Sequence, residues 1–432
     1  MSARDVAAAV LLIAGAAQQP RPDAFTQTFE AATDGEAVAT VRAGCAPCAW
    51  ADEGREAAVL RVALDGKYSQ HLALARGDGP NEYRVTLGAV TKGAHTLTLE
   101  RDRALSAINA GASAIAGATV EVLAGGGDGV AQSMAPILYA RPNTVGKFTD
   151  LPILMWYEVA PTSRGRQYRY SVIFTNEDGG TATDRLMATW GRTTDIEFVY
   201  GVEIDGDGRV LAEEFQGPGH EVPPFRGRHE GRHPLLWVST DNNMVSESGP
   251  TEIRYAPAPE RFDLTNASRE AVMDRHPWSY ALASGEMLRE GKIKDEGPGH
   301  NTIPDPRRFA FLEACGEVGR SALAFEVEVR GNWIASDRGR PQYRIVRDGC
   351  FRAAIPLPAG AQARDITAVR ARAYTRAPSD GQPPAPPNPV HLTRINTLFL
   401  LDDGYRPGRP LLRWAGSATL APDGAPFDLA VR

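Results

Sequence analysis

The amino-acid sequence predicts a mainly β protein, built as two to three antiparallel β-sandwich, jelly-roll-like modules in series. The chain has 432 residues, which is more than one small core accommodates and fits roughly two to four domains. Its 43 Gly and 32 Pro residues favour frequent turns over long helices. Short segments of alternating polar and apolar residues recur along the chain, as expected for strands with one solvated face.

The chain divides into four predicted parts. A Gly-Gly-Gly-Asp-Gly stretch at 125–129 is typical of a flexible break between modules. We expect a signal peptide at 1–17, an N-terminal β-sandwich at 22–124, a central β-sandwich at 135–305 and a C-terminal β module at 306–432.

The first residues predict export. An apolar run at 6–14 follows Arg4, and small residues provide a plausible cleavage site at 14–16. The alternative is a disordered Ala-rich tail, in which three large apolar residues at 11–13 would have no use. The run is shorter than the roughly 20 apolar residues that span a bilayer, and no other stretch approaches that length. We therefore expect a secreted or periplasmic protein without a transmembrane segment in the mature chain.

Charge and cysteine content limit the partners further. The net charge of −6 and the pI of about 5.8 give no basic surface, so we expect no nucleic-acid partner and no binding to an anionic membrane. Four cysteines agree with export and allow three disulfide connectivities. We favour pairs 45–48 and 315–350 as structural disulfides, since no second CxxC pair supports a zinc site.

Strand patterns are clearest in the N-terminal module. Residues 57–64 and 68–74 flank Asp65-Gly66, a strong hairpin signal. Residues 83–88 and 95–100 alternate cleanly, with a Lys92-Gly93 turn expected between them. The run at 83–102 resembles the closing hairpin of jelly-roll carbohydrate-binding modules, which implies a sandwich but says little about a ligand.

The other two modules carry further strands and one helical segment. The pattern at 269–291 is the most helical of the chain, although Pro277 interrupts it. Residues 378–389 are Pro-rich and predict an extended loop. We expect strands at 153–159, 168–175, 186–190, 196–204 and 209–215 in the central module, and at 324–330, 343–346, 366–374 and 392–401 in the C-terminal one.

Asp195 and Glu197 are the most informative acidic residues. In a strand starting at Asp195 they share one face, about 6.5 Å apart along the backbone. Two carboxylates held so close repel each other unless a cation, an arginine or a shared proton intervenes. Neighbouring apolar residues would anchor the opposite face.

Three uses of this pair stay open. A hard cation such as Ca²⁺ or Mg²⁺ could bind both carboxylates together with a loop oxygen of Asn176, Asp178 or Asp241. The pair could instead serve glycoside cleavage, for which carboxyl groups lie about 5–9.5 Å apart. The third interpretation is a solvated surface pair, bridged to Arg192 or Arg209.

Other candidates lie in the same module. His220, in a Gly-Pro-Gly-His loop, is a candidate general acid or base beside Asp195 and Glu197, although such a residue is usually a surface residue. Aromatic rings stack on sugars when exposed and form plain core when buried. The candidate ligand-binding residues are Trp156, Trp190, Arg192 and Asn242.

The phrase at 190–205 resembles two related β-sandwich families. The necrosis-inducing cytolysins carry Gly-His-Arg-His-Asp-Trp-Glu, and the vacuolar-protein-sorting-associated sixty-two family carries Gly-Asp-Trp-Glu. Gly191, Asp195 and Glu197 match these motifs, whereas Arg192 and Thr194 replace the two His and Ile replaces Trp. Residues 233–239 look like the later strand of the second family. The resemblance implies a divalent-cation site at Asp195 and Glu197 that receives a sugar head group.

A second metal motif lies next to this phrase. Residues 203–214 nearly match the spacing of an EF-hand loop, but Glu203 stands where Asp is expected and both flanks are predicted strands. We favour a hairpin turn at Asp205-Gly206-Asp207-Gly208.

The sequence contains no G-x-S-x-G, H-E-x-x-H, P-loop or dinucleotide motif. The favoured hypothesis is an exported glycan-binding protein with a cation-supported acidic site in the central module. A glycoside hydrolase or polysaccharide lyase using the paired carboxylates is the alternative, and a structural protein of the cell envelope is the third.

Overall fold

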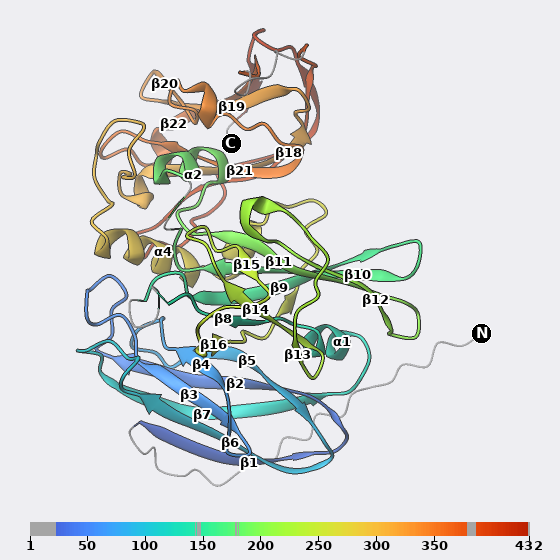
Figure 1. Cartoon of the computed structure of the whole chain (residues 1–432). Helices are drawn as coiled ribbons and strands as arrows, with labels where there is room; N and C mark the ends of the chain where they lie inside the picture. The colour runs from blue at the N-terminus through green and yellow to red at the C-terminus, as the bar shows by residue number, and fades with distance from the viewer. Residues whose placement is uncertain are drawn as a thin grey trace.

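The computed structural model describes residues 23–142, 144, 148–177, 179, 181–377 and 386–430. The predicted signal peptide, Asp178 and much of the Pro-rich loop lie outside these residues. The fold is mainly β, as predicted, and six sheets follow one another as three groups along the chain. In Figure 1 the N-terminal group lies at the bottom, the central group in the middle and the C-terminal group at the top.

The N-terminal group is a sandwich of a four-stranded and a three-stranded sheet, ordered β1-β6-β3-β4 and β5-β2-β7. The Asp65-Gly66 turn joins β3 to β4, which confirms the predicted hairpin. The chain turns near Lys92-Gly93 between β5 and β6, as predicted, but the two strands do not form a hairpin, because β5 pairs with β2 while β6 pairs with β1 and β3. Cross-sheet burial of alternate residues explains the clean alternation of both strands. The strands are β1 (Ala24–Ala31), β2 (Gly35–Ala46), β3 (Val59–Leu64), β4 (Lys67–Ala73), β5 (Asn81–Val90), β6 (Gly93–Asp102) and β7 (Ala112–Leu123).

The central group contains a sheet ordered β12-β11-β10-β9-β17 and a second sheet ordered β13-β14-β8-β16, with β15 added to β14. Strand β11 is buried along its whole length. It pairs with β12 through the turn at 205–208, which confirms the hairpin over the EF-hand loop. The strands are β8 (Ile137–Tyr139), β9 (Pro152–Pro161), β10 (Arg166–Phe174), β11 (Ile196–Ile204), β12 (Val210–Phe215), β13 (His229–Glu230), β14 (His233–Val238), β15 (Val245–Ser246), β16 (Arg254–Tyr255) and β17 (Glu260–Arg261).

Helices are few in the described residues. The strand predicted at 186–190 is wrong: this segment belongs to α2 (Thr183–Trp190), which ends at Gly191 in a left-handed conformation. Its apolar side chains are buried, partly against the C-terminal sheet, so tertiary packing outweighed the local strand signal. The helical segment interrupted at Pro277 is confirmed as α3 (Ala271–Arg275) and α4 (Trp278–Arg289), and α1 (Asp128–Ser133) follows the first sandwich. Short 3-10 turns are η1 (Pro218–His220), η2 (Pro306–Arg308), η3 (Pro341–Tyr343) and η4 (Ala363–Asp365).

The C-terminal group pairs two four-stranded sheets, ordered β21-β18-β23-β24 and β20-β19-β22-β25, around one apolar core. The strand predicted at 343–346 is wrong, since this segment follows η3 and keeps only an isolated bridge at Ile345. Both expected disulfides, 45–48 and 315–350, are present. The strands are β18 (Phe309–Glu317), β19 (Ser321–Val329), β20 (Asn332–Ala335), β21 (Gly349–Pro356), β22 (Ile366–Thr375), β23 (Val390–Leu400), β24 (Leu412–Leu420) and β25 (Phe427–Leu429).

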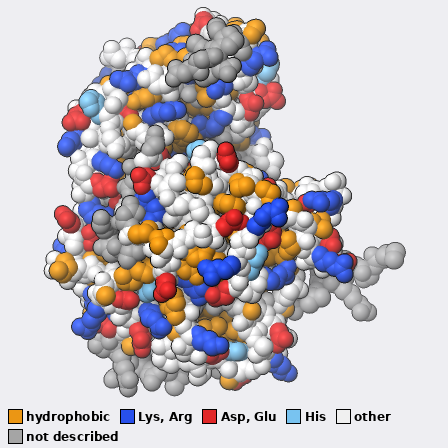
Figure 2. All heavy atoms as spheres, viewed as in Figure 1, with side chains coloured by type: hydrophobic (Ala, Val, Ile, Leu, Met, Phe, Trp, Pro, Cys, Tyr) orange, Lys and Arg blue, Asp and Glu red, His pale blue; other side chains and the backbone are white. Residues whose placement is uncertain are grey.

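Apolar clusters connect the three groups. One cluster joins Trp50 and Val59 of the N-terminal sandwich to Leu151 and to Leu282 of α4. Another joins Ile196 and its neighbours to Phe311 and other residues of the C-terminal sheet. The surface in Figure 2 mixes acidic and basic side chains, which agrees with the modest net charge. Within the described part of the chain, no helix has the length and apolar character needed to cross a bilayer.

Candidate functional site

Asp195 and Glu197 lie where the central sheet begins. Glu197 is the second residue of β11, and Asp195 directly precedes that strand and accepts a backbone hydrogen bond from Phe174 at the end of β10. The two side chains share a face, as predicted, and hydrogen-bond to each other. They are not solvated: Asp195 is 1% exposed and Glu197 is 9% exposed. The interpretation as a surface pair is therefore wrong, because loops from the second sheet cover the strand end.

Arginine and amide groups surround the pair. Arg192 lies 3.5 Å from Asp195 through Nη1 and 3.2 Å from Glu270 through Nε. Asn243 donates from Nδ2 to Asp195 at 3.0 Å. This places Arg192 as an internal counterion and not as an exposed ligand-binding residue, since its side chain is buried. Arg209, the other predicted partner, is not among the ion pairs of the described residues.

A short polar chain runs from Glu197 to the surface. Gln216 donates from Nε2 to Glu197 at 2.5 Å, and the same atom lies 3.3 Å from Nδ1 of His220. His220 is exposed in η1. The structure thus brings His220 into the vicinity of Glu197, with Gln216 between them.

Burial dominates the electrostatics of this acidic cluster. Burial and the Asp195 carboxylate raise the pKa of Glu197 to about 8, while Arg192 opposes the shift. Burial also raises the pKa of Asp195 above its ordinary value. Glu177, on the loop after β10, has a pKa raised to about 7 by burial and by Asp195. The pair consequently holds a proton near neutral pH, as expected for adjacent carboxyl groups in a poorly solvated site.

Three residues around this acidic cluster have left-handed backbone conformations. Asp150, His220 and Asn243 are non-Gly residues with φ of 54°, 62° and 57°. Such left-handed conformations cost free energy and are concentrated at functional sites. Asn243 is fully buried, and its Oδ1 has no hydrogen-bond donor among the described residues. A buried acceptor beside carboxylates is the kind of group that a cation or an ordered water satisfies.

The remaining predicted residues are dispersed. Trp156 is fully buried in an apolar cluster, so its ring is not available for stacking on a sugar. The Trp190 ring packs against Arg347 of the C-terminal module, 5.2 Å from ring centroid to guanidinium. Asn242 accepts from Thr240 within its own loop, and its neighbour Asn243 contacts Asp195 instead. Asp241 is exposed and pairs with Arg141, and Asp178 lies outside the described residues.

The observed geometry of Asp195 and Glu197 bears differently on the two predicted uses of this pair, cation binding and glycoside cleavage. Among described residues, no three His, Cys, Asp or Glu side chains are grouped to hold a metal ion. Asp195 and Glu197 still supply carboxylate oxygens of the kind that Ca²⁺ and Mg²⁺ use, although Asn243 turns its amide nitrogen, and not its oxygen, to Asp195. The glycosidase arrangement does not fit, because carboxyl groups in mutual hydrogen-bond contact lie closer than the roughly 5 Å of the tightest such pairs.

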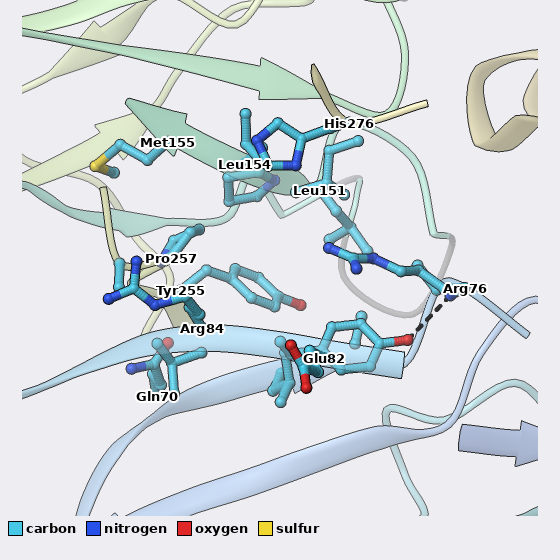
Figure 3. Close-up of a pocket in the computed structure, with 18 of the residues that line it drawn as sticks. Gln70, Arg76, Glu82, Arg84, Leu151, Leu154, Met155, Tyr255, Pro257 and His276 are labelled. Carbon is cyan, nitrogen blue, oxygen red and sulfur yellow. Dashed lines mark hydrogen bonds between the residues drawn. The ribbon is translucent and has the colours of Figure 1, made fainter. Parts of the chain in front are cut away.

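A pocket that was not predicted from the sequence lies between the N-terminal sandwich and the central module. Its volume is about 240 Å³. Figure 3 shows residues of β4 and β5 on one side, including Gln70 and Glu82, and residues of β9 with His276 on the other. Its rings come from Tyr83, Tyr255, His276 and Trp278, and its polar side chains from Gln70, His71, Arg76, Glu82, Arg84 and Glu260.

No local motif marks this pocket. Its walls come from three regions that are distant in the sequence, within 70–85, 151–155 and 255–278. The only sequence signal for the pocket was that residues 68–84 contain more aromatic and charged side chains than a solvent-exposed strand requires. Only the packing of the modules shows that these residues face Trp278.

Comparisons with known proteins leave the family open. No protein-family model matches the chain, and no curated protein matches it either. A family two carbohydrate esterase from Clostridium thermocellum in complex with cellohexaose has 15% identity and a TM-score of 0.15, covering 28% of this chain and 30% of its own. Tandem CBM51 modules of the family 98 glycoside hydrolase from Streptococcus pneumoniae have 10% identity and a TM-score of 0.16, covering 77% and 72%. TM-scores this low do not show a shared fold. The resemblance to the cytolysins and the sixty-two family is not supported.

Proposed function

We propose that this protein binds a saccharide, and that the ligand occupies the pocket between the N-terminal sandwich and the central module. The observation that carries the proposal is the pocket lining, which contains both aromatic rings and hydrogen-bonding side chains. Sugars present apolar C–H faces and a rim of hydroxyl groups, so they need both kinds of partner.

The geometry of the pocket supports a small ligand. Its volume of about 240 Å³ lies below the roughly 300–1,000 Å³ of sites for drug-sized ligands. Tyr255 lines the pocket from β16, and Gln70 is held by hydrogen bonds to Thr86 and Ala256. The walls belong to paired strands, which keeps these groups in place before a ligand arrives.

Filling the pocket tests the proposal. Ala73, at the end of β4, lines it, and Ala73→Phe would place a ring in the cavity. Ala89→Phe, on the exposed side of β5, is the matched control. We expect calorimetric titration with methyl glycosides and disaccharides to show binding that Ala73→Phe weakens at least tenfold and Ala89→Phe preserves. Absence of binding across neutral and acidic sugars, or equal binding by both variants, would refute it.

The acidic cluster supports a second candidate function. The adjacent carboxylates of Asp195 and Glu197 favour a cation-supported site in the central module, and Asn243, whose Nδ2 binds Asp195, has an unsatisfied Oδ1 as a further candidate ligand. A bound Ca²⁺ or Mg²⁺ would satisfy this oxygen and raise the melting temperature, because it binds only the native state.

The cation is tested on the purified chain after chelator treatment. Millimolar Ca²⁺ or Mg²⁺ should raise the melting temperature of the wild type and leave that of Asp195→Asn unchanged. Glu203→Gln, on the same strand but bonded to Thr162 and Arg164, serves as the control and should still respond. If neither ion changes the melting temperature of the wild type, the proposed cation site is ruled out.

A further inference from the structure

Arg76 is the unusual charge in the pocket. Its guanidinium stacks on Trp278, 3.7 Å from the ring centroid, and lies 5.1 Å from the ring of Tyr83. Figure 3 shows its side chain reaching into the space between His276 and Glu82. The guanidinium has no carboxylate within ion-pair distance among the described residues, and its Nε is buried without an acceptor. Burial lowers the pKa of Arg76 to about 10, which reflects the cost of this placement.

The other charges that line the pocket already have partners. Glu260 accepts from Nε2 of His276 at 3.1 Å, and this bond lowers the pKa of Glu260. Arg84 contacts Glu121 at 2.8 Å. His71 lies 2.7 Å from the Tyr68 hydroxyl and 3.3 Å from Asp102.

Glu82 is the acid that could be expected to neutralise Arg76. It pairs instead with Arg42 at 3.9 Å, with both side chains more than half exposed. Glu82 and Glu260 attract Arg76 through space, and neither forms a hydrogen bond to it. The guanidinium of Arg76 therefore lies at the wall of the cavity without a direct ion-pair partner among the described residues.

From these contacts we infer that the pocket selects an acidic saccharide, whose carboxylate pairs with Arg76. This inference rests on the proposed function, since it specifies the class of sugar that the same pocket holds. Stacking on Trp278 occupies a face of the guanidinium, and the edge formed by its two Nη groups has no acceptor among the described residues. A planar carboxylate accepts two parallel hydrogen bonds from such an edge, which a neutral hydroxymethyl group cannot do.

The size of the pocket narrows the class further. A cavity of about 240 Å³ accommodates a terminal sugar unit and not a long polymer segment. The ligand class is thus a uronic acid, free or at the end of a short chain. A sulfated sugar has the same charge with a tetrahedral anion, and a separate arm of the experiment distinguishes it.

The experiment compares matched pairs of sugars. Glucuronate is titrated against glucose, galacturonate against galactose, and glucose 6-sulfate is the sulfate arm. We expect at least one uronate to bind tenfold or more tightly than its neutral partner. Arg76→Gln should remove that preference, and Arg76→Lys should restore only part of it because the paired hydrogen bonds are lost. Arg61→Gln removes an arginine that stacks on Tyr68 of the same sandwich outside the pocket, and should change nothing.

The outcomes separate the inference from the function on which it rests. Equal binding of neutral and acidic sugars overturns the inference and leaves the proposed function standing. A uronate preference that survives Arg76→Gln also overturns the inference, since a residue other than Arg76 would then bind the carboxylate. Preference for the sulfate over both uronates refutes the carboxylate assignment. If no sugar binds, the proposed function fails as well.

Discussion

Glu197 illustrates how burial changes the chemistry of a single residue. The ordinary pKa of a glutamate is about 4.3, and the site raises that of Glu197 to about 8. Between these values the folded protein holds a proton that the unfolded chain releases. The stabilisation from this group is therefore complete below about pH 4 and is lost as the pH rises through about 8.

Glu197→Gln tests this linkage. Gln keeps the shape and the neutral charge, so we expect the variant to lose less stability than the wild type between pH 5 and pH 9. One pKa unit corresponds to about 1.4 kcal/mol, so the difference should reach a few kcal/mol. Urea unfolding at a series of pH values measures it. Glu203→Gln is the control: the pKa of Glu203 is lowered, so this substitution should not alter the slope in that range. Parallel curves for Glu197→Gln and wild type would contradict the expectation.

The residues around Glu197 show which side-chain orientations can be predicted from the sequence and which cannot. The pairing of Asp195 with Glu197 follows from the two-residue period of a strand. The period does not tell whether Asn242 or Asn243 turns inward, because the loop adopts a left-handed conformation at Asn243. Asn242 was the predicted ligand-binding residue, but its neighbour Asn243 is the one that binds Asp195.

At the scale of elements, α2 depends on the residue that ends it. Gly191 has φ of 61°, and a Cβ there would lie 2.6 Å from Cγ of Arg352. Arg352 is fully buried and binds Asp274 and Glu313, each at 2.6 Å, so it has little freedom to move. The glycine therefore permits both the end of the helix and its contact with the C-terminal module.

Gly191→Ala should destabilise the protein more than Gly208→Ala does. Both glycines have positive φ, but a Cβ at Gly208 meets no atom within 4 Å. The conformational cost of about 1–2 kcal/mol is common to both, and the clash with Arg352 should add about 1–3 kcal/mol for Gly191→Ala. Chemical denaturation of the two variants gives the difference. Equal losses would show that Arg352 moves aside freely.

At the scale of the whole molecule, apolar clusters cross both boundaries between modules. Trp50 of the N-terminal sandwich packs with Phe148 and Leu282, and Phe311 of the C-terminal sheet packs with residues of the central one. Interfaces of this kind couple the unfolding of neighbouring modules. The three modules consequently stabilise one another.

We expect a single cooperative unfolding transition. Scanning calorimetry should give one heat-absorption peak, with a calorimetric enthalpy close to the van't Hoff enthalpy. Trp50→Ala should weaken the coupling and separate an earlier transition of the N-terminal sandwich, because it removes a buried ring from the shared cluster. Two resolved peaks in the wild type would show that the modules unfold independently.

The sequence by itself determined the β class, most strands, the hairpins at 65–66 and 205–208 and the shared face of Asp195 and Glu197. These features depend on side-chain periodicity, on turn residues and on spacing, all of which are local. Only the tertiary structure decided that Asp195 and Glu197 are buried beside Arg192, that 186–190 is helical, and that Arg76 stacks on Trp278 in the lining of a pocket. Desolvation and cavities arise where segments distant in sequence pack together, and no local pattern records that packing.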